Sequence, residues 1–252
     1  MTSLEVLFTP ADFTQLAQRD LSETVCVVFD VLRATTTIVT ALSNGAEAIL
    51  PVEDISQALA ARQRQLHVLL AGERNGVRIG TELTGAAAFD LGNSPREFTR
   101  DVVHGKTIVM TTTNGTRALR ACRNARMTLA ASFLNLRATA EAIRQANPRG
   151  LSLVCSGTVE QAAYEDVLGA GALCDLLWTS AQAGLIADSA QIARELFLQS
   201  RDDLRSAFSR SRNARRLLSL PELRDDVGFC LQRDTAPLVA VLGKDGLVRA
   251  GG

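Results

Sequence analysis

Short apolar runs alternate along the chain with longer stretches in which apolar residues recur at helical spacing. Runs rich in β-branched residues predict strands, and amphipathic stretches predict helices. The predicted strands are 25–29, 48–52, 68–71, 107–111, 127–131, 151–155 and 238–242. The predicted helices are 10–17, 35–42, 55–65, 95–102, 116–121, 134–144, 165–178, 188–198 and 214–218. This alternation indicates an α/β protein, which we expect to be a three-layer α/β/α fold with a mixed, largely parallel sheet.

Two predicted helices carry a recognisable start. Ser94 precedes Pro95 and, three positions on, Glu97, which predicts a capping box with proline at the first helical position. The segment 9–12 is a weaker version of the same pattern.

The whole chain, 1–252, is expected to form one α/β catalytic unit, because neither a linker nor a low-complexity segment divides it. Segments 24–52 and 105–131 both read as strand, polar turn, helix and strand, which suggests a weak internal repeat. Since any two strand–turn–helix units look alike, chance similarity stays open.

Composition limits the classes of partner. The chain has 27 basic and 27 acidic residues and only 4% aromatic residues, so we expect neither nucleic acid nor an anionic membrane as a partner. The start of the chain has no leader-like pattern, and no run of eighteen apolar residues occurs. The five cysteines lack zinc-type spacing and predict buried, reduced thiols in a cytoplasmic protein. An apolar surface on helix 165–178 makes a homodimer conceivable, although such surfaces are more often core.

Candidate chemistry gathers after the predicted strands, where open α/β sheets place their ligands. The polar residues there are Asp30, Arg33, Thr35 and Thr36, then Glu73 and Arg74, Asp90, Asn93 and Ser94, Asn114, Gly115 and Thr116, and finally Glu165 and Asp166. Several of these residues have simpler explanations. Thr35, Ser94 and Thr116 could be helix caps, and the adjacent Glu165 and Asp166 could simply interact favourably with the dipole of their helix. Asp30 is the sharpest signal, since an acid that ends an apolar strand needs Arg33, a metal or solvent nearby.

Several strings in this sequence resemble the 2-phosphosulfolactate phosphatase family. They are VVFDVLRATTT, AGER, FDLGNSP, MTTTNGTRAL and a later Gly-Thr followed by Glu165 and Asp166, in consistent order. The resemblance implies a magnesium-dependent hydrolase, associated with coenzyme M biosynthesis, that converts (2R)-2-phospho-3-sulfolactate to 3-sulfolactate and phosphate. Tyr164 and the segment 213–215 depart from the expected pattern, so the reaction type is better supported than the substrate.

The roles expected at the matching positions fall into three groups. Asp30, Arg33, Glu73 and Asp90 are the expected catalytic residues. Substrate binding is expected from Thr35, Thr36, Arg74, Asn93, Ser94, Asn114, Gly115 and Thr116. The expected oxygen ligands of Mg²⁺ are Asp30, Asp90, Glu165 and Asp166, with arginines neutralising a small polyanionic substrate.

Two chemical routes stay open. Metal-bound water could attack, with Glu73 or Asp90 as base, or Asp30 could attack and form an aspartyl phosphate. Leu32 stands where haloacid dehalogenase phosphatases carry a second acid, which disfavours the covalent route. The competing functions are a phosphatase of another small phosphorylated hydroxy acid and a non-catalytic anion-binding module.

Overall fold

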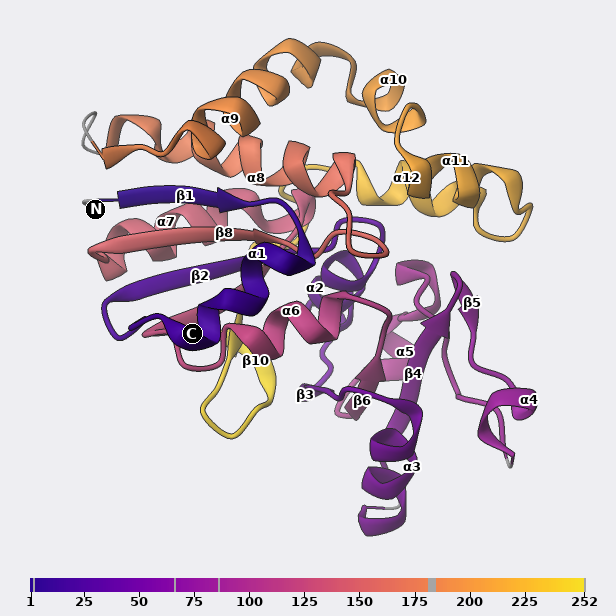
Figure 1. Cartoon of the computed structure of the whole chain (residues 1–252). Coiled ribbons are helices and arrows are strands. Elements are labelled where there is room, and N and C mark those ends of the chain that lie inside the picture. Colours follow the sequence, from indigo (N-terminus) through magenta and orange to yellow (C-terminus); the bar gives the residue numbers. More distant parts are fainter. Residues whose placement is uncertain (2, 66, 86, 181–184, 252) are drawn as a thin grey trace.

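The computed structural model describes residues 1, 3–65, 67–85, 87–180 and 185–251. Helices cover both faces of a mixed sheet, which confirms the three-layer α/β/α prediction (Figure 1). The strands are β1 Ser3–Leu7, β2 Thr24–Phe29, β3 Ala48–Pro51, β4 Leu69–Arg74, β5 Val77–Arg78, β6 Thr107–Thr111, β7 Met127–Ala131, β8 Gly150–Cys155, β9 Val239–Leu242 and β10 Val248–Gly251.

The α-helices lie between these strands and, in the last third of the chain, follow one another. They are α1 Pro10–Thr14, α2 Ala34–Ser43, α3 Ile55–Arg64, α4 Thr81–Thr84, α5 Arg100–Val103, α6 Gly115–Ala121, α7 Leu136–Ala146, α8 Tyr164–Leu177, α9 Asp188–Ser200, α10 Leu204–Ser209, α11 Arg212–Ser219 and α12 Arg224–Cys230.

The sheet consists of two parallel blocks joined by a hairpin. Its order is β1-β8-β2-β7-β9-β10-β3-β6-β4-β5, in which β1, β8, β2 and β7 run parallel, as do β3, β6 and β4. The β9–β10 hairpin pairs antiparallel with β7 on one side and with β3 on the other. Figure 1 shows the second block turned steeply against the first, so the carboxyl ends of β2 and β4 approach the same region.

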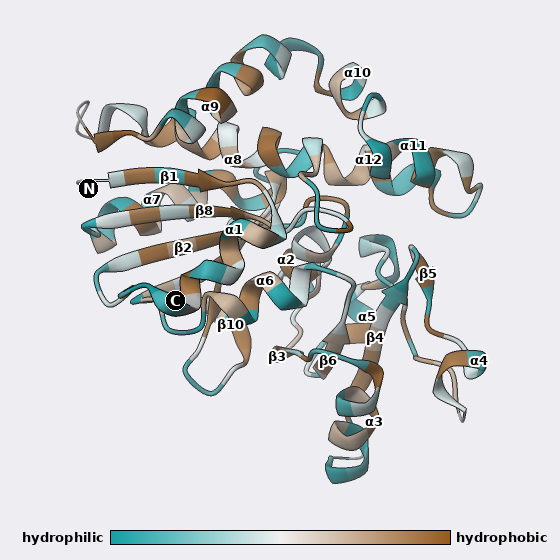
Figure 2. Cartoon of the chain, in the orientation of Figure 1, coloured by the Kyte–Doolittle hydropathy of each residue, from teal (hydrophilic) through white to brown (hydrophobic). Residues whose placement is uncertain are grey.

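Strand β2 is apolar from Val25 to Phe29, and both of its faces are covered. Val25, Val27 and Phe29 pack into the cluster under α7, α8 and α9, while Cys26 and Val28 pack into the cluster that includes α2 and α6. Side chains alternate between the faces of a strand, so a continuous apolar run satisfies both layers. Figure 2 shows the same arrangement as hydrophobic strands between helices with hydrophilic outer surfaces.

The seven predicted strands and most predicted helices are present, with ends shifted by a few residues. The prediction missed the strands β1, β5 and β10, and the helices α4, α10 and α12. The helix predicted at 95–102 is wrong, because the chain there forms a 3₁₀ turn, Pro95–Glu97, and then α5.

The two predicted helix starts have opposite outcomes. Thr9 and Asp12 do form a capping box at α1. Ser94 forms none: its hydroxyl donates to Asp226, and the Glu97 carboxylate instead accepts from the amide of Gly92 and pairs with Arg78. Tertiary partners therefore outcompete the local cap.

The two segments proposed as a repeat interlock in the sheet. Strand β2 of the first pairs parallel with β7 of the second, and β3 of the first pairs with β6 of the second. A common origin stays a prediction, since two similar units can also arise separately.

The five cysteines are buried and free, as expected of structural thiols. Within the portion that the structure describes, none of the helices has the length and apolar character needed to cross a bilayer.

Candidate active site

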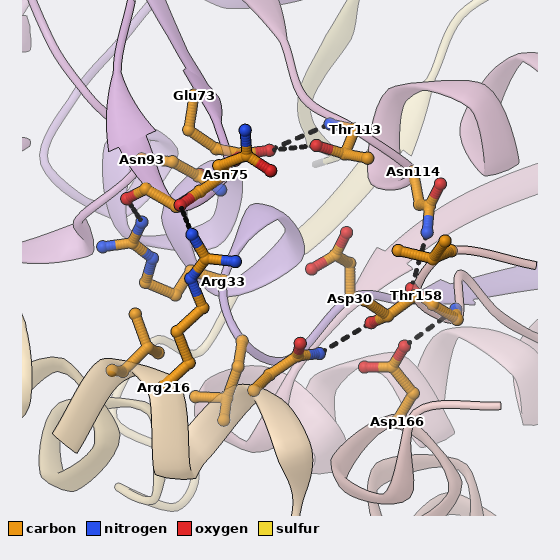
Figure 3. A pocket seen from close by; sticks show the side chains of 16 residues that line it. Asp30, Arg33, Glu73, Asn75, Asn93, Thr113, Asn114, Thr158, Asp166 and Arg216 are labelled. Atoms are coloured by element: carbon orange, nitrogen blue, oxygen red, sulfur yellow. Dashed lines mark hydrogen bonds between the residues drawn. The ribbon is translucent and has the colours of Figure 1, made fainter. Parts of the chain in front are cut away.

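A cavity of about 130 Å³ lies where β2, β4, β6 and β8 end. Six of the predicted site residues line it: Asp30, Arg33, Glu73, Asn93, Asn114 and Asp166. Figure 3 shows the Asp30 carboxylate pointing into this space, with the other side chains around it. The sheet thus brings together polar groups from five separate parts of the sequence, as expected of an open α/β sheet.

Asp30 is fixed between the end of β2 and the first turn of α2. Its Oδ1 accepts from the amide of Ala34 at 3.1 Å, and its own amide donates to Thr35 Oγ1 at 3.0 Å. The other carboxylate oxygen lies against the start of α6, where a Cβ on Gly115 would stand 2.5 Å from Asp30 Oδ2 and 2.6 Å from Ala34 Cβ. Only glycine allows the two helix starts to approach so closely.

Glu73 connects the end of β4 to the loop after β6. Its Oε1 accepts from both the amide and the hydroxyl of Thr113 at 2.9 Å, and its Oε2 accepts from the amide of Gly76 at 2.6 Å. With both oxygens engaged, Glu73 is better suited to position these loops than to accept a proton from water.

The turn after Glu73 follows from its sequence. Asn75 and Gly76 have φ values of 57° and 80° and connect β4 to β5. Two consecutive positive φ values are characteristic of the tight Asn-Gly hairpin turn. This turn places the Asn75 side chain and Gly76 on the cavity wall.

The adjacent acids at the start of α8 face different places. Asp166 lines the cavity, where its Oδ1 accepts from the amide of Val31 at 2.8 Å and its Oδ2 from Ser156 Oγ at 3.1 Å. Glu165 instead lines a neighbouring cavity, and its Oε1 accepts from Asn213 Nδ2 at 2.5 Å. Successive helical residues diverge by about 100°, so the two side chains point in different directions, and Glu165 Oε2 is buried without a hydrogen-bond partner. The role of Glu165 as a metal ligand stays a prediction.

Burial perturbs these carboxyl groups. Removal from water, with the charges of Glu73 and Glu165 nearby, raises the pKa of Asp30 to about 6. Burial and the charges of Glu165 and Asp30 raise the pKa of Asp166 well above its usual range. Such shifts cluster at functional sites, and here they mark a cavity rich in negative charge.

Arg33 reaches the cavity already paired. Its guanidinium donates to Asp226 at 2.7 Å and to the carbonyl of Gly76 at 2.6 Å, and both charged side chains are 3% exposed or less. Ser94 also donates to Asp226, at 2.7 Å. Of the three partners considered for Asp30, which were Arg33, a metal and solvent, Arg33 forms its ion pair with Asp226 of α12 instead.

Asp90, which was predicted to have a catalytic and metal-binding role, is not among the residues that line the cavity. Its carboxylate pairs with Arg62 and accepts from the amide of Leu70 at 2.7 Å. Leu70 is near the start of β4, whereas Glu73, at the end of that strand, faces the cavity. The ion pair with Arg62 therefore accounts for the acidic residue at position 90.

The remaining predicted binding residues are not among those that line the cavity. Thr35, Thr36 and Thr116 are buried and bond to nearby backbone groups of their own loops. Arg74 donates to backbone and hydroxyl oxygens of Glu73 and Thr111 rather than lining the cavity. Gly115 contributes close packing, as described above, and Ser94 lines a neighbouring cavity.

Several lining residues were missed by the sequence-based prediction. They are Asn75, Thr113, Thr158, Asn213 and Arg216. Asn114 and Asn213 hold Gly157 and Thr158 in place through hydrogen bonds of 2.9 and 2.7 Å. The turn residues carried a signal, since they flank predicted sites, but nothing local distinguishes Arg216 from its many neighbouring arginines.

The lining fits Mg²⁺ only in part. No cluster of three or more His, Cys, Asp and Glu side chains suited to a metal occurs among the residues with described placement. Proteins commonly hold Mg²⁺ through one or two carboxylates, with water and substrate oxygens completing the shell. Asp30 and Asp166 can serve in that way, and the buried amide oxygen of Asn93 lacks a hydrogen-bond partner. Protein side chains alone therefore do not complete a coordination shell for Mg²⁺ at this site.

Comparison with known proteins shows to which family the chain belongs. The family model described as 2-phosphosulpholactate phosphatase matches residues 11–245. The chain belongs to the 2-phosphosulfolactate phosphatase family. A protein of Pseudothermotoga lettingae, named probable 2-phosphosulfolactate phosphatase, is 40% identical over 98% of both chains. One of Thermotoga petrophila with the same name is 41% identical over 86% of this chain and 88% of its own.

Another relative, from Caldicellulosiruptor saccharolyticus, also bears that name and is 36% identical over 90% of this chain and 93% of its own. The resemblance inferred from the motifs is therefore confirmed. The family name describes phosphoric monoester hydrolases, so membership supports the expected class of enzyme.

Proposed function

We propose that this member of the 2-phosphosulfolactate phosphatase family hydrolyses (2R)-2-phospho-3-sulfolactate to 3-sulfolactate and phosphate in the presence of Mg²⁺. The observation that carries the proposal is the convergence of Asp30, Glu73 and Asp166 on one small cavity. A pure anion receptor would avoid carboxylates beside its ligand, so this lining favours a site that binds a phosphate ester together with a cation.

Asp30 and Asp166 are the groups proposed to hold Mg²⁺ with the substrate phosphate. The ion, when bound, would offset the repulsion between these carboxylates and the phosphoryl oxygens and polarise the phosphoryl group. Glu73 keeps the loops after β4 and β6 together, so that the cavity retains its shape in the presence of this charge.

The reaction transfers the phosphoryl group from the C2 oxygen of sulfolactate to water. An O–P bond to water forms, the O–P bond to the C2 oxygen breaks, and the leaving oxygen gains a proton. The attacking water gives up one proton, which balances the proton that the leaving oxygen gains. Direct attack by Asp30 is the alternative, and trapping with beryllofluoride distinguishes it, because modification of Asp30 would support the covalent route.

The same proposal places the enzyme in the cytoplasm, in a route associated with coenzyme M. Its five buried free cysteines are consistent with a reducing compartment.

A substrate panel with metal control tests the function. Purified protein, stripped with EDTA and then supplied with Mg²⁺, is assayed for phosphate release from 2-phosphosulfolactate, 2-phosphoglycerate and p-nitrophenyl phosphate. We expect the highest kcat/KM for 2-phosphosulfolactate, lost in EDTA and restored by Mg²⁺. A clear preference for another phosphorylated hydroxy acid would replace the proposed substrate, and indifference to EDTA would remove the metal.

A further inference from the structure

Arg216 is a cation at the cavity that the proposed chemistry leaves unused. Arg33 and Arg216 are the arginines among the lining residues. The charge of Arg33 is compensated by Asp226, which is fully buried and lies 2.7 Å away. Arg33 is therefore poorly placed to compensate an additional negative charge on a ligand.

Arg216, by contrast, makes no ion pair within the part of the chain described. It is exposed on α11, and its Nη2 donates to the carbonyl of Asn75 at 2.5 Å. Figure 3 shows its guanidinium reaching the cavity from α11, on the side away from Asn114 and Asp166. A cavity rich in acids thus has one uncompensated cation at its rim.

The Asn-Gly turn holds this guanidinium in place. The carbonyls of Asn75 and Gly76 accept from Arg216 and Arg33, respectively. One nitrogen of Arg216 is anchored in this way, and the rest of its planar donor fork stays available. An anchored guanidinium loses less entropy when it binds an anion than a freely moving one does.

The chemistry of the substrate determines which anion can reach that rim. On the proposed function, the phosphate lies at Asp30 and Asp166. The substrate carboxylate is bonded directly to the phosphorylated carbon, whereas the sulfonate lies one methylene further away. We infer that Arg216 binds the sulfonate of 2-phosphosulfolactate and is the residue that selects for it. A guanidinium can donate two parallel hydrogen bonds to sulfonate oxygens, as it does to phosphate.

The inference rests on the proposed function, and a pair of substrates separates the two. In 2-phosphoglycerate a hydroxyl replaces the sulfonate while the phosphate and carboxylate are unchanged. The variants are Arg216→Gln and the matched control Arg215→Gln. Arg215 is exposed on the same helix and likewise donates to one carbonyl, that of Arg210, at 2.5 Å, but it does not line the cavity.

Steady-state kinetics on both substrates is the experiment, with thermal unfolding as a check on folding. We expect Arg216→Gln to lower kcat/KM for 2-phosphosulfolactate about 10- to 100-fold, mainly through KM, because a charge-assisted hydrogen bond is lost. Its kcat/KM for 2-phosphoglycerate should stay within about 3-fold, and Arg215→Gln should leave both substrates unchanged.

Two results would overturn the inference while the proposed function stands. One is an active wild type in which Arg216→Gln has no effect, and the other is an equal loss on both substrates, which would indicate a role in shaping the cavity. A wild-type protein that does not hydrolyse 2-phosphosulfolactate would instead refute the proposed function, and the sulfonate role with it.

Discussion

At the scale of single residues, position after a strand predicted the candidate site better than residue type did. Asp30 and Asp90 both follow apolar segments and both were expected to bind metal, yet only Asp30 lines the cavity. Asp90 forms an ion pair with Arg62 of α3. Such pairing depends on tertiary packing, so local sequence alone could not separate the two acids.

Replacing Asp30 tests whether its carboxylate lowers the stability of the folded protein while it serves the proposed reaction. Because its pKa is raised from 3.8 to about 6, the unfolded state loses this proton at lower pH than the folded state does. The carboxylate therefore reduces stability as pH rises from about 4 to 6, and the penalty persists above that range. Asp30→Asn cannot ionise and keeps an oxygen for the Ala34 amide.

We expect Asp30→Asn to abolish activity but to unfold at a higher temperature than wild type at pH 7.5, by about 2–4 °C for each kcal/mol gained. Thermal unfolding in EDTA at pH 7.5 and pH 4 measures this, and the difference should shrink at pH 4. A variant that is destabilised at pH 7.5 and unchanged at pH 4 would refute the assignment.

Gly115 offers a steric test of the same region. A Cβ there would meet Asp30 Oδ2 at 2.5 Å, so Gly115→Ala should destabilise the protein by about 1–3 kcal/mol and reduce activity. Gly228→Ala in α12 is the control, because a Cβ at that position would meet nothing within 4 Å. Urea unfolding measures both, and equal effects of the two substitutions would argue against the close contact.

At the scale of elements, apolar periodicity located the long helices and buried strands, because those segments are bounded by polar turns. It missed short elements whose formation depends on neighbours, such as β5, which has two residues, and β10, which pairs with β9 and β3. The capping box predicted at Ser94 also fails because of a distant partner, since the Ser94 hydroxyl donates to Asp226 of α12.

The buried ion pair of Arg33 and Asp226 connects α12 to the loop after β2. Asp226→Ala should destabilise the protein by about 3–5 kcal/mol, because it leaves a buried guanidinium unpaired. The double variant Arg33→Met with Asp226→Leu should lose less stability than Asp226→Ala alone.

Asp225→Ala is the matched control for that pair, since its side chain is 70% exposed, and it should change stability by less than about 0.5 kcal/mol. Chemical denaturation measures the free energy of unfolding of each variant. An Asp226→Ala protein as stable as Asp225→Ala would contradict the structural role of the pair.

At the scale of the whole molecule, the class of fold could be predicted from the alternation of strands and helices. The way in which the two parallel blocks of the sheet are joined could not. The β9–β10 hairpin closes the gap between the parallel blocks, and its contact with β3 is one registered pair, Val248 with Ile49. That arrangement turns one block against the other and brings the ends of β2, β4, β6 and β8 to one cavity. Long-range pairing of this kind leaves little trace in sequence.

The convergence of these ends is the central claim, and a pair of aspartates tests it most directly. The measurement is kcat/KM for 2-phosphosulfolactate in Mg²⁺ for Asp166→Asn, inside the cavity, and Asp90→Asn, outside it. We predict a loss of about 10²- to 10⁴-fold for Asp166→Asn. For Asp90→Asn we predict a change of less than about 3-fold. Loss of activity in Asp90→Asn, with Asp166→Asn as active as wild type, would contradict the account.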